Sequence, residues 1–158
     1  MLAAALAIGV FATAVFDLWG VLVARVLGLP VNDWRMGGRW FSHLLRGRAR
    51  HAAIAAAPAL PGEQAVGWIG HYLVGCCFAL LTVAIGGRDW LAAPGIALPL
   101  AVGLLTVGFG WFVMSPCMGA GIAAARSPAP GRARAIGLAA HAVFGLAMWA
   151  GAWMLAAA

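Results

Sequence analysis

The sequence predicts an all-α integral membrane protein that forms a single domain of four transmembrane helices. Of its 158 residues, 65% are hydrophobic and 9% are charged, which leaves too little polar surface to cover a soluble globule. Four apolar stretches reach the length of about 20 helical residues that is needed to cross a hydrocarbon core. Basic residues gather in two segments between these stretches and predict how the chain is threaded through the membrane.

Each expected helix follows from the extent of an apolar run. The first run has no positive charge at its amino end and is longer than the core of a signal peptide, so we interpret it as a mature membrane helix. The third run is overlong, and its prolines predict a start near Pro94 and a kink near Pro116. The expected helices span residues 2–24, 64–86, 91–125 and 135–157.

The placement of arginine predicts the topology. All ten basic residues are arginines, and nine of them follow the first or the third expected helix. By the positive-inside rule these two segments face the cytoplasm, and both termini face the opposite side. The net charge of +6 therefore indicates contact with a bilayer that contains anionic headgroups. Nucleic acid is excluded as a partner, because the chain offers no soluble face large enough to bind it.

The segment of residues 34–57 predicts an amphipathic helix in the layer of lipid headgroups. Trp40, Phe41, Leu44 and Leu45 share one helical face, while basic residues occupy another. Lipid anchoring is the first interpretation, and a lid or an anion-binding site at the membrane surface is the alternative. The arginines expected to contact lipid or an anion are Arg39, Arg46 and Arg50.

Two of the four histidines have a glycine four residues before them and another four residues after them. Residues four apart share a helix face, so each imidazole would be flanked by positions without side chains. Such a frame leaves room for a second backbone or for a flat ligand. The two frames are Gly67, His71 and Gly75, and Gly137, His141 and Gly145.

Depth counting places Asp17, His71, Cys117 and His141 in one layer of the membrane. Each lies seven to nine residues from the charged residue that marks the cytoplasmic end of its helix. At about 1.5 Å per residue, this is about 10–13 Å inside the boundary. A carboxylate in hydrocarbon must find a partner or take up a proton. The sequence therefore predicts an intramembrane polar site formed by Asp17, His71 and His141.

Three hypotheses compete for this site. The first is a cofactor site, in which His71 and His141 ligate a haem, or the two histidines, Asp17 and Cys117 ligate a transition metal. The second is translocation of a proton or a small solute, which would require a homo-oligomer or another membrane protein as partner. The third is a structural lock, in which the polar groups bond across helices that the glycines allow to approach.

An enzyme is not expected. Ser115 and Tyr72 are the nucleophiles of interest within the helices, and neither has an evident base or oxyanion partner in the sequence.

Several short motifs, taken together, resemble one known family. They are Phe11-Ala-Thr-Ala-Val-Phe-Asp17-Leu-Trp-Gly20, Gly38-Arg-Trp40, Arg46-Gly-Arg with His51, Pro61-Gly-Glu63 followed by Gly67-Trp68 and His71-Tyr72, Gly119-Ala-Gly121, and His141 with Phe144-Gly145. The combination is similar to an uncharacterised family of bacterial inner-membrane proteins, the domain of unknown function 2938. The resemblance spans nearly the whole chain.

This resemblance implies a four-helix, multi-pass protein of the bacterial inner (cytoplasmic) membrane, and it implies no activity, substrate or cofactor. The family pattern has glutamine before the proline of the third helix and no fixed cysteine after it. Ser115 and Cys117 depart from that pattern, which weakens Cys117 as a ligand.

Overall fold

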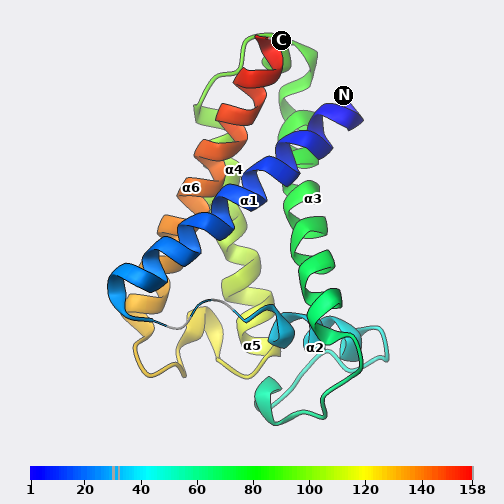
Figure 1. Cartoon of the computed structure of the whole chain (residues 1–158), viewed down its shortest axis with the longest axis vertical. Helices are drawn as coiled ribbons and strands as arrows, with labels where there is room; N and C mark the ends of the chain where they lie inside the picture. Colours follow the sequence, from blue (N-terminus) through cyan, green and yellow to red (C-terminus); the bar gives the residue numbers. More distant parts are fainter. Residues whose placement is uncertain (30, 32, 158) are drawn as a thin grey trace. The chain divides into compact units, whose positions relative to one another are not determined.

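Within the part of the chain that the structure describes, four helices are long and apolar enough to cross a membrane. The computed structural model describes residues 1–29, 31 and 33–157, and its elements within these residues are all helical. The four candidate spans are Leu2–Leu27, Glu63–Ala92, Ala97–Cys117 and Pro130–Ala156 (Figure 1). The predicted all-α fold, with four helices long and apolar enough to cross a membrane, is thereby confirmed. The membrane concerned, the side on which each loop lies and the amphipathic surface helix stay predictions.

The chain divides into two compact units. The first, which we call the helix unit, comprises residues 1–32, 72–106 and 138–158. The second, which we call the loop unit, comprises residues 33–71 and 107–137. Each unit is described by itself below, and the single domain expected from the sequence stays a prediction.

The helix unit contains α1 (Leu2–Leu27), most of α3 (Glu63–Ala92), the first part of α4 (Ala97–Phe109) and most of α6 (Pro130–Ala156). Small side chains let these helices approach closely, as is common between membrane helices. A Cβ atom at Gly9 would lie 2.6 Å from the Cα atom of Cys76. The core is built of alanine and larger apolar residues: Ala5, Ile8, Ala12, Ala79, Val83, Trp90, Val102, Phe144, Ala147, Met148 and Ala152.

The turn between α3 and α4 is held by two indoles of the helix unit. Gly87 adopts φ 67° and ψ −162°, which breaks the helical path of α3 close to its expected end. The indole N–H of Trp90 then donates to the carbonyl of Gly95 at 2.9 Å. The indole of Trp149 donates to the carbonyl of Pro94 at 3.0 Å. The turn's carbonyls are thereby satisfied by side chains, and α4 begins at Ala97, after Pro94.

The expected distortion near Pro116 takes the form of a π-helix, Gly110–Met114, which is labelled η2. It leads into α5 (Ser115–Cys117), whose Pro116 has no N–H to continue the regular bonding pattern. The helix ends at Cys117, so the predicted extent to residue 125 was too long. Gly119 and Gly121 have φ values of 94° and 77°, a region that an α-helix does not use. The 3₁₀ turn η3 (Ile122–Ala124) follows.

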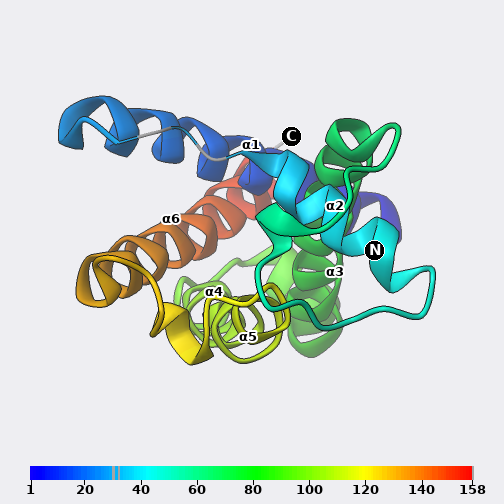
Figure 2. The same ribbon diagram turned by 90° about the horizontal axis from the view of Figure 1, so that it is seen from below.

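The loop unit begins with α2 (Trp34–Leu44). The carboxylate of Asp33 caps α2 by accepting from the N–H of Arg35 at 3.0 Å. The helix is shorter than the expected segment of residues 34–57, because Gly47 turns the chain with φ 79°. A short 3₁₀ turn, η1 (Ile54–Ala56), precedes α3. Figure 2 shows α2 beside the first turns of α3, where Gly38 contacts the Glu63 carbonyl.

Candidate functional site

His141 lies on α6 and is bonded to α4 within the helix unit. Its Nδ1 atom is 3.2 Å from the carbonyl oxygen of Gly103 and 3.2 Å from Oγ1 of Thr106. The hydroxyl of Thr106 donates to the same Gly103 carbonyl at 2.8 Å. Because a carbonyl oxygen can accept but not donate, Nδ1 is the nitrogen that carries the proton. The imidazole therefore joins α6 to α4 as a hydrogen-bond donor.

The glycine frame of His141 is filled on one side by the backbone of α4. A Cβ atom at Gly145 would lie 2.7 Å from the Pro99 oxygen and 2.9 Å from the Leu100 Cα atom. On α4, a Cβ atom at Gly103 would lie 2.6 Å from the carbonyl oxygen of His141. The space predicted beside this imidazole thus holds a neighbouring helix. Gly137 differs, because its nearest neighbour would be Nε1 of Trp111 at 3.7 Å.

The frame of His71 is also filled by protein. The imidazole stacks on the indole of Trp34 with ring centroids 3.6 Å apart and planes 20° apart. A side chain at Gly67 would collide with the carbonyl of Trp34, which belongs to the same loop unit. In the helix unit, a side chain at Gly75 would collide with Oγ1 of Thr13. Three of the four framing glycines therefore serve close packing.

Asp17 lies on α1 in the helix unit, and its partner is a tyrosine. The carboxylate interacts with the hydroxyl of Tyr72 on α3 through its charge and a side-chain hydrogen bond. The preceding residue, Phe16, places its ring edge-on to His141 with centroids 5.8 Å apart. Tyr72 could not be connected to Asp17 from the sequence, because a lone tyrosine in an apolar helix has no characteristic spacing to other polar residues. The carboxylate of Asp17, the phenol of Tyr72 and the imidazole of His141 therefore belong to three helices of the helix unit.

The four predicted metal ligands are divided between the two units of the structure. Among the residues that the structure describes, no group of three or more His, Cys, Asp or Glu side chains could hold a metal ion. Asp17 and His141 belong to the helix unit, whereas His71 and Cys117 belong to the loop unit. Cys117 is a free thiol, and its carbonyl accepts from the backbone N–H of His51 at 2.8 Å. The common layer of these four residues stays a prediction.

Arg39 is buried inside the loop unit, although it was expected to face lipid or an anion. Its guanidinium forms a two-pronged ion pair with the carboxylate of Glu63, with N–O distances of 2.8 and 2.9 Å. A further N–H group donates to backbone carbonyls, including those of Ala55 and Ala57 at 3.1 Å. The ion pair raises the pKa of Arg39. Arg46 and Arg50 are exposed, and their contact with lipid headgroups stays a prediction.

The loop unit also contains a histidine pair that sequence reasoning missed. His43 and His51 are both 7% exposed, and their rings meet edge to face with centroids 4.9 Å apart. Nε2 of His43 is 3.0 Å from the carbonyl oxygen of Pro58. The two histidines are separated by the turn at Gly47, so no helical spacing relates them. Only their presence in one arginine-rich segment could have drawn attention to them.

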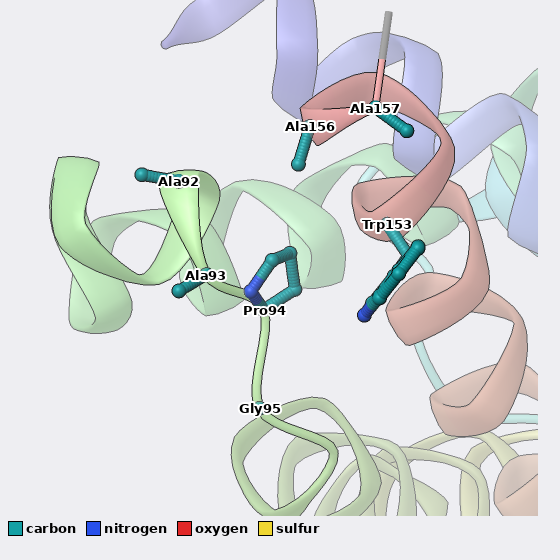
Figure 3. A pocket seen from close by; sticks show the side chains of 7 residues that line it. All are labelled: Ala92, Ala93, Pro94, Gly95, Trp153, Ala156 and Ala157. Atoms are coloured by element: carbon teal, nitrogen blue, oxygen red, sulfur yellow. The ribbon is translucent and has the colours of Figure 1, made fainter.

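A hollow of about 460 Å³ lies in the helix unit at the turn between α3 and α4. Figure 3 shows Trp153 and Pro94 on opposite sides of it, with small residues completing the wall. Its lining consists of Ala92, Ala93, Pro94, Gly95, Trp153, Ala156 and Ala157. None of these side chains is titratable, and none belongs to the predicted site. The hollow therefore offers apolar contact but no chemistry.

Comparison with known proteins identifies the family. A family described as protein of unknown function (DUF2938) matches residues 6–155. The chain belongs to this family. The resemblance noted from the motifs is thereby confirmed, and the match covers nearly all of the four candidate membrane spans. No curated protein matches the DUF2938 chain, and no solved structure matches it. The family description assigns no activity, so function has to be argued from the geometry.

Proposed function

We propose that this DUF2938 protein is a multi-pass membrane scaffold in which His141 is a structural lock between α4 and α6. The observation that carries the proposal is the position of Nδ1, which is bonded to both the Gly103 carbonyl and the Thr106 hydroxyl. The backbones of the two helices also meet at Gly103 and Gly145. Small residues with hydrogen bonds across the contact are the usual means of joining membrane helices. On this proposal the imidazole stabilises the fold and carries out no reaction.

The lock can be tested by exchanging His141 for two amides. The amide of asparagine can occupy the position of Nδ1, whereas the longer glutamine places its amide near the position of Nε2. Because the lock uses Nδ1, His141→Asn should unfold near the wild-type temperature, and His141→Gln should unfold at a lower one. The measurement is thermal unfolding of the purified full-length protein in detergent. A stable glutamine variant beside an unstable asparagine variant would contradict the proposal.

Proton translocation is the second candidate, and the pairing of Asp17 with Tyr72 favours it. A carboxylate within a membrane helix is costly, and such residues commonly lie on proton or ion pathways. The tyrosine hydroxyl gives this carboxylate a proton-bearing neighbour on another helix. Four helices form a narrow pathway, so this candidate also proposes a homo-oligomer or a membrane-protein partner. Proton flux across proteoliposome membranes separates this candidate from the lock.

The cofactor hypothesis predicts a spectroscopic signature. If His71 and His141 ligate a haem, the purified protein should show a Soret absorption band that His71→Ala abolishes. If a transition metal binds, elemental analysis should find it in stoichiometric amount. The lock predicts colourless protein free of tightly bound metal, provided that purification avoids chelators. A stoichiometric cofactor that depends on His141 would contradict the lock as the sole role of this residue.

A further inference from the structure

Two loops of the loop unit, residues 51–54 and residues 117–119, contact each other, and we call this contact the latch. The backbone N–H of His51 donates to the carbonyl of Cys117 at 2.8 Å, and that of Ile54 donates to the carbonyl of Met118 at 2.9 Å. Gly119 packs so closely on Ala52 that a side chain there would collide with the Ala52 carbonyl. The latch joins the segment before α3 to the end of the α4–α5 span.

His51 lies in this contact with its ring buried. The residue is 7% exposed, and neither ring nitrogen has a hydrogen-bond partner among the described residues. Buried polar atoms without partners are rare, and each calls for a physical explanation. A metal ion is a poor explanation, because the described part of the chain contains no group of three ligating side chains. An imidazole can also take up a proton near neutral pH.

The groups around His51 disfavour its protonation. Burial lowers the pKa of His51, and Arg48 on its own loop and His43 on α2 lower it further. The backbone carbonyl of Cys117, on α5, acts in the opposite direction, because its oxygen favours the charged ring. The two carboxylates of the loop unit are already paired, Glu63 with Arg39 and Asp33 with Arg35. A protonated His51 would therefore be a charge buried among other positive groups.

We propose that the latch is pH-sensitive, closed while His51 is neutral and open when His51 is protonated. An open latch lets the imidazolium reach water, which frees residues 51–54 from residues 117–119. A group whose pKa is lowered in the closed state stabilises that state above its ordinary pKa, and the stabilisation is lost as the pH falls. For His51 the ordinary value is 6.5, so the loss begins just below neutral pH. This inference does not depend on the role of His141.

Amide hydrogen exchange of the purified full-length protein tests the latch. The protection of the Ile54 amide, corrected for intrinsic exchange, is compared between about pH 7.5 and about pH 5.5. We expect protection to fall by up to about tenfold per pH unit below 6.5, because opening is coupled to one proton. The matched variant His51→Phe keeps an aromatic ring without a titratable group, and its protection should not depend on pH.

Two results would overturn the proposal. One is equal protection of wild-type Ile54 at both pH values. The other is an equal loss of protection in His51→Phe, which would assign the effect to His43 or to another group. If the variant did not fold, an NMR titration of His51 in the wild-type protein would decide, since a pKa at or above 6.5 contradicts a latch that opens on protonation.

Discussion

Nδ1 of His141 lies 3.2 Å from the carbonyl oxygen of Gly103, on a neighbouring helix of the same unit. This hydrogen bond crosses a contact in which Gly145 lies against the backbone of Pro99 and Leu100. Glycine on both sides of the contact lets the two backbones come close enough for the imidazole to reach a main-chain acceptor. Gly103, Gly145 and the histidine are therefore parts of one interaction between α4 and α6.

The first prediction concerns the two glycines that frame His141. Gly145→Ala should destabilise the protein by about 1–3 kcal/mol, because the new methyl group meets backbone atoms that cannot rotate away. Gly137→Ala is the matched control, since its methyl group would have an ordinary contact with Trp111. We expect the control to be within about 0.5 kcal/mol of the wild type or more stable. Chemical or thermal unfolding in detergent measures both, and equal effects would refute the packing role of Gly145.

The second prediction concerns the ion pair of the loop unit. Arg39→Met should lower the unfolding temperature and expose residues 54–57 to hydrogen exchange, because Glu63 and several carbonyls lose their donors. Arg39→Lys should restore little of the lost stability, since a single ammonium group cannot replace the planar, multiply bonded guanidinium of arginine. Arg46→Met is the control at an exposed position. If Arg39→Met and Arg46→Met behaved alike, Arg39 would have no structural role.

The third prediction separates the lock from proton translocation. Asp17→Asn removes the titratable group but keeps a side chain that can hydrogen-bond to Tyr72. If the protein moves protons, this variant should abolish flux in proteoliposomes while its unfolding temperature stays close to that of the wild type. If the site is purely structural, neither the wild type nor the variant should show flux above empty vesicles. If Asp17→Asn showed the same flux as the wild type, Asp17 would not lie on the proton pathway.

The four apolar helices were predictable because many consecutive apolar residues contribute to each of them. Each span contains enough apolar residues to cross a bilayer, and the structure has four such helices. Their ends were less predictable, because they depend on single residues. The third span stops at Cys117, before two glycines with positive φ, and α2 stops at Leu44, shortly before Gly47.

The contacts of the predicted site residues could not be derived from the sequence. The frames around His71 and His141 mark helix positions without side chains, but periodicity carries no information about which group lies against them. Trp34 and the backbone of α4 fill that space, and both are distant in sequence from the imidazole they contact. His43 and His51 went unnoticed for the same reason, because a turn and not a helix brings them together.

A double-mutant cycle between His141 and Thr106 tests the central claim most directly. The free energy of unfolding is measured in detergent for the wild type, His141→Leu, Thr106→Val and the double variant. The lock predicts a coupling energy of about 0.6 kcal/mol, and up to about 1.7 kcal/mol, as found for hydrogen bonds between membrane helices. A coupling energy of zero, with the two single effects simply adding, would contradict the account.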